Sequence, residues 1–154
     1  MEGMNYWEKL RVNCSVLRLV MFSKKKSSRE NSDTKRACEM GTACYKMGDY
    51  ENALIYLHRA AIGGNAMAIC GVGMIYIKGL GVEQDGKKAL YWFRKGAKLK
   101  DSQSQYMVGM IYYDGIGVKQ NLKRAARWLH KSALQGFSMA QFKLGYMYEK
   151  GIGF

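Results

Sequence analysis

Apolar and polar residues follow a pattern that returns along this chain every 36 residues. Gly73, Gly109 and Gly145 are each 36 positions apart. The stretches 66–101 and 102–137 share 14 identical positions out of 36, where chance would give about 2. Similarity at a fixed period of this length is typical of repeat proteins, in which each repeat is one small supersecondary unit. We therefore expect a stack of similar units.

Each unit is predicted to be a pair of antiparallel helices. Apolar residues recur at helical spacing for about 12 residues, up to a Gly-x-Gly pair where the chain must turn. Ser-Gln-Ser-Gln at 102–105 and Ser-Met-Ala-Gln at 138–141 are predicted capping boxes, each of which opens a first helix. Second helices are expected to begin near Asp85 and Asn121. Stacked pairs of this kind predict an all-α solenoid.

The glycines have two predicted roles. One glycine in the middle of each first helix costs about 1 kcal/mol relative to alanine, so we expect it to allow close approach of another helix. The paired glycines are expected at positive φ, where the chain turns. The residues predicted to shape the repeat in these ways, with the tryptophans of the second helices, are Gly73, Gly109, Gly145, Gly79, Gly81, Gly115, Gly117, Trp92 and Trp128.

The motifs resemble a known repeat family. One copy reads Val-Gly-Met-Ile-Tyr at 72–76, Gly-Leu-Gly-Val at 79–82 and Lys-Ala-Leu-Tyr-Trp at 88–92. These stretches resemble the Sel-one-like repeat (SLR) family, and Gly-Asp-Tyr-Glu-Asn-Ala at 48–53 looks like the related tetratricopeptide repeat. The resemblance implies an all-α, right-handed superhelical solenoid of about three and a half repeats that acts as a non-catalytic adaptor.

One domain preceded by an N-terminal extension is predicted. Residues 35–154 form the solenoid, with units 35–65, 66–101, 102–137 and a partial unit 138–154, and residues 1–34 form a basic extension. The extension has helical apolar spacing up to Met21 and then three lysines, which favours a capping helix and a linker over a secretory signal. A helix on a membrane surface is an alternative. Because the last unit stops after its first helix, we expect that end to pack on another molecule, a second copy included, or to belong to a longer array.

The charge favours some partners over others. The chain of 154 residues carries 25 Lys and Arg against 12 Asp and Glu, a formal net charge of +13. Many of the basic residues are predicted on second helices, where a solvated face is the simplest interpretation. That field could also attract an acidic protein, nucleic acid or an anionic membrane. Nucleic acid is not favoured as the main ligand, because aromatic and basic residues are expected on different faces.

No motif of catalysis or cofactor binding is convincing. The stretch 81–88 approaches a phosphate-binding loop, but Lys88 stands where Ser or Thr would hold magnesium, and a helix precedes the loop instead of a strand. His58 and His130 are expected on the polar side of second helices, without converging metal ligands. We therefore expect no cofactor, no metal and no enzyme activity.

The cysteines favour a reducing compartment. No Cys-x-x-Cys occurs, and some SLR proteins carry disulfides between the helices of a unit. A bridge from Cys38 to Cys70 would be strained, because it would join neighbouring helices whose axes lie about 8–10 Å apart. We expect free thiols and a cytoplasmic protein, with a periplasmic or membrane-associated one as the alternative.

The predicted binding surface is the concave groove lined by first helices. Methionine and aromatic side chains, which suit adaptable interfaces, are frequent there. The predicted groove residues are Tyr45, Met67, Met74, Ile77, Tyr106, Met110, Tyr113, Met139, Phe142 and Tyr146. The predicted function is therefore the binding of a protein partner in this groove. An immunity protein that neutralises a secreted bacterial toxin and a membrane-surface adaptor are the alternatives.

Overall fold

The computed structural model describes residues 31–153. Predictions made for residues 1–30 lie outside the described residues. Residues 31–47 are helical, and six further helices follow: α2 (Tyr50–Ile62), α3 (Ala66–Lys78), α4 (Gly86–Lys98), α5 (Ser102–Asp114), α6 (Leu122–Leu134) and α7 (Ser138–Glu149). Residues 31–153 contain no strand. The prediction of an all-α fold is confirmed.

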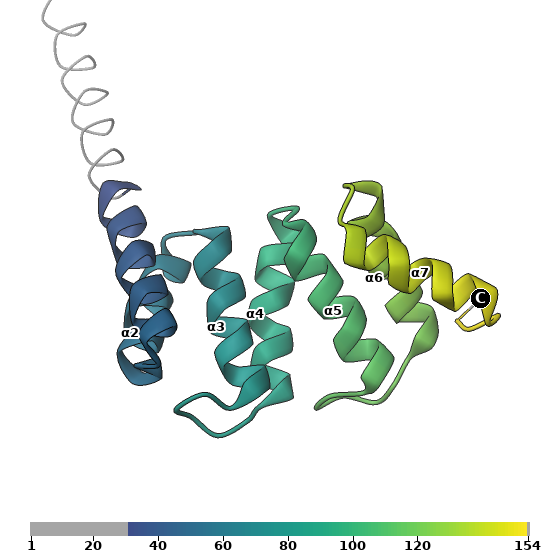
Figure 1. Cartoon of the computed structure of the whole chain (residues 1–154), viewed down its shortest axis with the longest axis horizontal. Coiled ribbons are helices and arrows are strands. Elements are labelled where there is room, and N and C mark those ends of the chain that lie inside the picture. Colours follow the sequence, from purple (N-terminus) through teal and green to yellow (C-terminus); the bar gives the residue numbers. More distant parts are fainter. Residues whose placement is uncertain (1–30, 154) are drawn as a thin grey trace, which may run out of the picture.

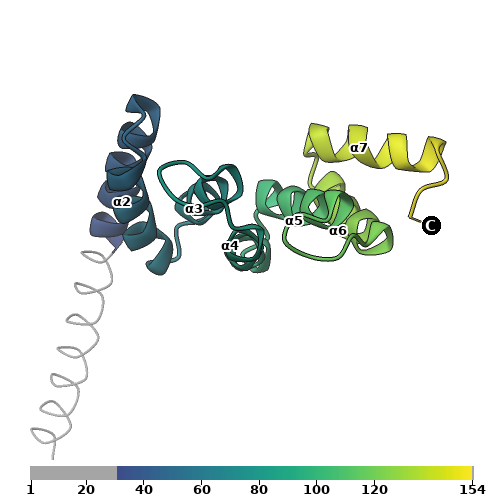
Figure 2. The same cartoon turned by 90° about the horizontal axis from the view of Figure 1, so that it is seen from below.

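The helices form a single row of antiparallel pairs (Figure 1). Helix 31–47 pairs with α2, α3 with α4 and α5 with α6, and α7 follows as the first helix of the fourth unit. The row curves, so that its two ends lie toward the same side (Figure 2). The first helices α3, α5 and α7 lie on the inner side of this curve, with α4 on the outer side. The predicted solenoid is therefore present.

Side chains just before the helices stabilise their first turns. Asp101 accepts a hydrogen bond from the Ser104 amide at 2.7 Å, and Asn121 accepts one from the Arg124 amide at 2.9 Å. Each bond satisfies an amide that has no partner within its helix. The second helices α4 and α6 thus follow Asp85 and Asn121 as predicted.

The two predicted capping boxes are wrong. The residue that caps α5 is Asp101, and α7 has no side-chain cap. Ser102 and Ser138 are the first residues inside their helices, so their hydroxyls are not at the capping position. The glutamines that would complete the boxes donate instead to the end of the preceding helix, and Gln141 Nε2 lies 3.2 Å from the Ala133 carbonyl oxygen.

The mid-helix glycines of α3 and α5 are contact points with the second helix of the same unit. A Cβ on Gly73 would lie 2.7 Å from the Phe93 ring, and a Cβ on Gly109 would lie 2.8 Å from Leu129 Cγ. Gly145 does not have this role, because no described atom outside its own helix lies within 4 Å of such a Cβ. The expected close approach is therefore absent at Gly145, since no second helix follows α7 in the described residues.

The Gly-x-Gly pairs adopt the predicted left-handed conformation. Gly79, Gly81, Gly115 and Gly117 have φ of 66°, 65°, 74° and 68°. The second glycine of a pair also touches the start of the previous second helix. A Cβ on Gly117 would lie 2.8 Å from the backbone of Gly86. This glycine therefore serves both the turn and the stacking of neighbouring units.

The core runs through the row in two clusters that meet at α4. Trp92 is buried in the cluster of the first two units, whereas Phe93 is buried in the cluster that continues to α7. Trp128 is half-buried against the second cluster. Adjacent residues of one helix thus join the two clusters.

Candidate protein-binding site

The first helices of the four units, 31–47, α3, α5 and α7, form a surface that we call the front face. A hollow of about 290 Å³ opens between the first three of them, and Tyr45, Met67 and Met74 line it. Thr42, Cys70 and Gln103 complete much of its wall. Three of the predicted groove residues are therefore brought together. Their side chains come from two neighbouring units, which is expected for a groove that runs across the repeats.

Other predicted groove residues lie farther along the front face and are half-buried. Ile77, Tyr106 and Tyr113 pack against the core, as Met74 of the hollow also does, and Met110 is half-buried. The Tyr106 ring contacts the Phe137 ring at a centroid distance of 5.3 Å. These side chains therefore stabilise the solenoid while part of each remains accessible.

Two strongly exposed apolar side chains of the front face lie on α3 and α7. Phe142 on α7 is 79% exposed and Met67 on α3 is 69% exposed. Met139 and Tyr146 are exposed on α7 as well. Lys143 Nζ lies 3.7 Å from the centroid of the Tyr113 ring, so a cation covers part of the surface between α5 and α7. The front face therefore combines a small hollow with an apolar patch on α7.

Charge separates the front face from the opposite one. Among the helices α3, α5 and α7, the charged residues are Lys78, Asp114, Lys143 and Glu149. Helices α4 and α6, which form what we call the rear face, carry five and four basic residues and no acidic residue. The prediction that basic residues concentrate on second helices agrees with this placement.

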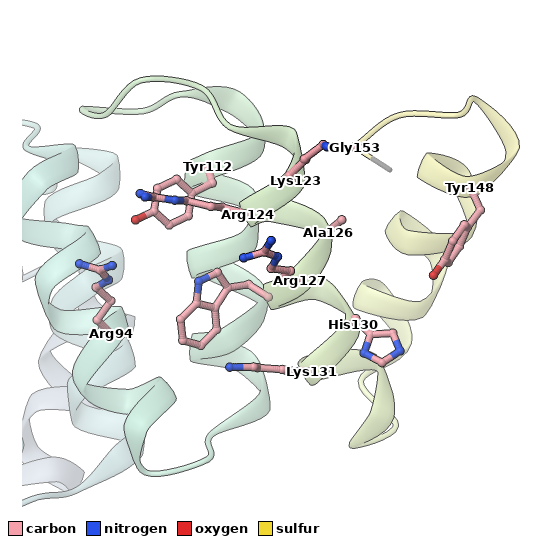
Figure 3. Close-up of a pocket in the computed structure, with 11 residues that line it drawn as sticks. Arg94, Tyr112, Lys123, Arg124, Ala126, Arg127, His130, Lys131, Tyr148 and Gly153 are labelled. Atoms are coloured by element: carbon pink, nitrogen blue, oxygen red, sulfur yellow. The ribbon is translucent and has the colours of Figure 1, made fainter.

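Two recesses open on the rear face. The larger, about 680 Å³, is lined by residues that include Arg94, Arg127, Trp128 and Tyr148 (Figure 3). The smaller, about 550 Å³, lies between Tyr91, Arg94 and Trp128. The expectation that aromatic and basic residues occupy different faces is wrong, because tyrosines and a tryptophan stand among the cations here. Basic and aromatic residues at helical spacing in α4 and α6 could have indicated this arrangement.

The repeat is found in known proteins. A model of the Sel1 repeat matches four consecutive stretches of the chain, 36–65, 66–101, 102–137 and 138–153. The chain belongs to the Sel1 repeat family. Sel1 repeats are generally protein–protein interaction modules and non-catalytic scaffolds. No match was found among curated proteins.

Three solved bacterial structures share the fold. A Sel1 repeat protein from Oxalobacter formigenes is 34% identical, with a TM-score of 0.72 over 75% of this chain and 48% of its own. A protective antigen of uropathogenic Escherichia coli with an SLR fold is 32% identical, with a TM-score of 0.74 over 80% of this chain and 27% of its own. The present chain thus spans about half and about a quarter of their lengths. Helicobacter pylori cysteine rich protein B has the same fold at 24% identity, with a TM-score of 0.60 over 79% of this chain and 96% of its own.

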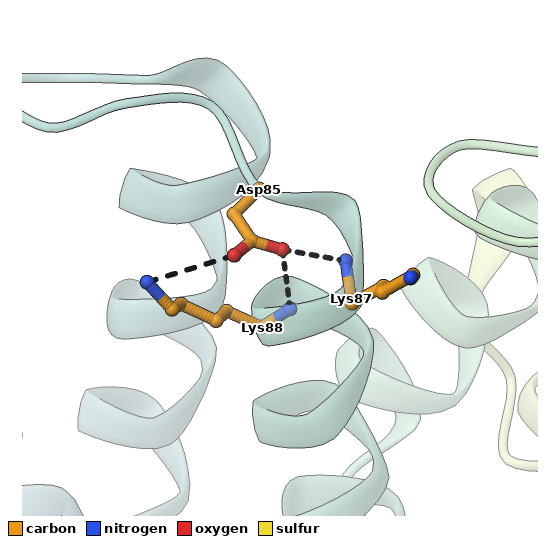
Figure 4. Close-up of polar contacts among 3 residues, drawn as sticks. All are labelled: Asp85, Lys87 and Lys88. Carbon is orange, nitrogen blue, oxygen red and sulfur yellow. Dashed lines mark hydrogen bonds and ion pairs between the residues drawn. The ribbon is translucent and has the colours of Figure 1, made fainter.

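The stretch that approaches a phosphate-binding loop serves the Sel1 repeat as a helix start. The Asp85 carboxylate accepts hydrogen bonds from the Lys87 and Lys88 amides at 3.0 and 2.9 Å (Figure 4). A phosphate would need the same amides. The hydrogen bond from the Lys88 amide does most to lower the pKa of Asp85. Burial opposes it, and the Lys87 amide and the Lys88 charge lower the pKa further. The protein's own carboxylate therefore occupies this anion position.

The remaining candidates for chemistry are apart from one another. In residues 31–153, Cys38, Cys44 and Cys70 are free thiols, and no cluster of His, Cys, Asp and Glu could hold a metal ion. Burial, and then the charge of Asp101, raises the pKa of Cys70 to about 12, so its thiol is not a nucleophile at neutral pH. The His58 and Trp92 rings meet in a T-shaped arrangement with a centroid distance of 5.1 Å. No helix among the described residues is long and apolar enough to cross a membrane.

Proposed function

We propose that this Sel1 repeat chain is a non-catalytic module that binds a protein partner along its front face. The observation that carries the proposal is the pairing of a hollow, lined by Tyr45, Met67 and Met74, with an exposed apolar patch on α7. Exposed apolar patches beside a groove are typical of protein interaction sites. The low charge of α3, α5 and α7 supports the same function, because charged residues are depleted at interface cores.

Different residues of the front face are proposed to contribute differently. Phe142 and Met67 are proposed as anchors, since burying a large apolar side chain contributes about 1.5–3 kcal/mol. Methionine adapts to irregular partner surfaces because its side chain is unbranched and flexible. The half-buried tyrosines Tyr106 and Tyr113 present a rigid rim that loses little entropy on binding.

The test replaces the two anchors by glutamate. Partner proteins are captured from the native cell with the wild-type chain and with Met67→Glu/Phe142→Glu, and are quantified by mass spectrometry. We expect recovery of the partner to fall by about tenfold or more, because two charges would be buried in an apolar interface. The matched control is Ile55→Glu/Leu134→Glu, which places the same charges at 64% and 76% exposed positions of second helices. Equal loss with both pairs, or loss with neither, would refute a front-face site.

The identity of the captured protein separates the possible roles. A secreted toxin as partner, with growth restored on co-expression, would make the chain an immunity protein; any other partner favours an adaptor. A second copy is a further possible occupant of the α7 patch. Light scattering over a range of concentrations tests it, and a Phe142→Glu variant that stays monomeric while the wild type dimerises would demonstrate self-association through α7.

A further inference from the structure

The rear face holds an excess of positive charge that the described residues, 31–153, do not neutralise. Nine cations of α4 and α6 face no acidic residue on either helix. In residues 31–153, an ion pair reaches this set only at Lys88, whose Nζ lies 3.6 Å from the Asp85 carboxylate. Unpaired like charges raise the free energy of the folded chain. An acidic ligand on this face would remove that cost.

The cations stand in rows along the two helices. Lys123, Arg127 and Lys131 are spaced by four residues on α6, so they follow one side of that helix at steps of about 6 Å. On α4, Lys87, Arg94 and Lys98 are spaced by seven and four residues and also share one side. Alternate side chains of an extended peptide repeat at about 6.7 Å. The two spacings are close enough for several carboxylates of one strand to meet successive cations.

The two recesses share part of their lining, and we call them together the rear channel. Both are lined by Arg94 and Trp128. Leu90 and Val118 add apolar surface to the smaller recess. Figure 3 shows Arg94 on α4 and Arg127 and Lys131 on α6 around the larger recess. Volumes of about 680 and 550 Å³ are in the range of ligand-binding clefts. A ligand with both negative and apolar groups therefore fits the channel.

The aromatic rings here already contact the protein's own cations. Lys131 Nζ lies 4.5 Å from the Trp128 ring centroid, and Lys95 Nζ lies 4.7 Å from that of Tyr91. The Arg124 guanidinium lies 5.6 Å from the centroid of Tyr112. Nucleic-acid bases bind by stacking on open ring faces, so these contacts disfavour nucleic acid. Carboxylates can bind the same cations without displacing them from the rings.

We propose that the rear face binds an acidic protein segment in extended conformation, with carboxylates at alternate positions and apolar side chains between them. The carboxylates meet Arg94 and Arg127, and the apolar side chains contact Leu90, Val118 and Trp128. This site is separate from the front face, so one chain can hold two partners at once.

The experiment measures binding of labelled peptides of about eight residues by fluorescence anisotropy, since α4 spans about 20 Å. The first probe is Glu-Leu-Glu-Ser-Glu-Leu-Glu-Ser, and the second replaces both leucines by serine. We expect Arg94→Glu/Arg127→Glu to weaken binding of the first probe by about tenfold or more. We expect the second probe to bind the wild type several-fold more weakly than the first, because it lacks the apolar groups.

The matched control changes the net charge equally at another place. Lys46→Glu/Lys78→Glu alters two exposed lysines of helix 31–47 and α3, and we expect less than about threefold weaker binding. Circular dichroism checks that both variants fold. Equal weakening in both variants would show only a diffuse field and overturn the proposal. Tighter binding of a thymidine oligonucleotide or of phosphatidylserine vesicles than of the first probe would overturn it as well.

Discussion

Tyr112 on α5 and Tyr148 on α7 occupy the same position in successive repeats, but their surroundings differ. Tyr112 is 5% exposed and Tyr148 is 57% exposed. The side chain of Arg124 on α6 covers Tyr112, whereas no second helix follows α7 in the described residues. The same difference separates half-buried Tyr106 from exposed Phe142. The position of a residue in the repeat therefore determines on which side of its helix it lies. Whether that residue is buried or accessible to a partner depends on the helix that packs beside it.

The largest expected effect on stability comes from removing the buried ring of Tyr112, and the exposed ring of Tyr148 provides the comparison. Tyr112→Ala should lower the free energy of unfolding by about 3–4 kcal/mol, because it leaves a cavity under α6. Tyr148→Ala should cost less than about 1 kcal/mol, as is usual for an exposed position. Urea denaturation followed by circular dichroism measures both. Similar losses for the two variants would show that α7 is as well covered as α5.

The turn glycines allow a second comparison. Gly117→Ala should destabilise the chain by about 3 kcal/mol, since a left-handed residue with a Cβ costs about 1–2 kcal/mol and the new Cβ would meet the Gly86 backbone at 2.8 Å. Gly151 has φ of 62° but open space around it. Gly151→Ala should therefore cost only the strain. Thermal unfolding of the two variants measures the difference in stability between them. Equal losses would mean that backbone strain alone matters and that the contact with Gly86 does not.

The mid-helix glycines should give effects of opposite sign. Gly109→Ala should destabilise by about 1–2 kcal/mol, because overpacking against Leu129 exceeds the gain in helix propensity. Gly145→Ala should stabilise by about 0.5–1 kcal/mol, because only the propensity changes. Denaturation midpoints of both variants provide the measurement. A loss of stability in Gly145→Ala would mean that α7 has a close neighbour in solution.

The smallest effect concerns the start of α5. Asp101→Ala should cost about 1 kcal/mol, since the Ser104 amide loses its acceptor. Ser102→Ala should change the unfolding free energy by less than about 0.5 kcal/mol, because its backbone carbonyl, and not its hydroxyl, accepts the bond from Ser132. The same denaturation assay ranks them. If Ser102→Ala lowered the unfolding free energy more than Asp101→Ala did, the predicted capping box would be correct after all.

Much of the fold could be predicted from the 36-residue period, because glycine, alanine and tryptophan recur where helices touch and chains turn. The caps and the role of Gly145 could not. A capping box with Ser102 as N-cap would start the helix at residue 103, but α5 begins one residue earlier, at Ser102, so that Asp101 is its N-cap. Gly145 looks like Gly109 in the sequence, and only the placement of α6 distinguishes them.

The candidate site was predictable in part. Helical spacing placed Met67, Met74 and Phe142 on first helices, but burial against neighbouring helices decides how much of each remains exposed. The rear channel requires that Arg94 of α4 and Trp128 of α6 reach one recess from two successive units. Such contacts between units depend on stacking geometry, which the sequence of a single repeat does not contain.

The central claim is that the front face binds the protein partner, and site-specific photo-crosslinking in the native cell tests it most directly. A benzophenone amino acid replaces Met67 or Phe142 on the front face, and Ile55 or Leu134 on second helices, all four of them exposed. The account predicts that the same partner is crosslinked from Met67 and Phe142 and not from Ile55 or Leu134. Crosslinking from Ile55 and Leu134 with none from the front face would contradict it.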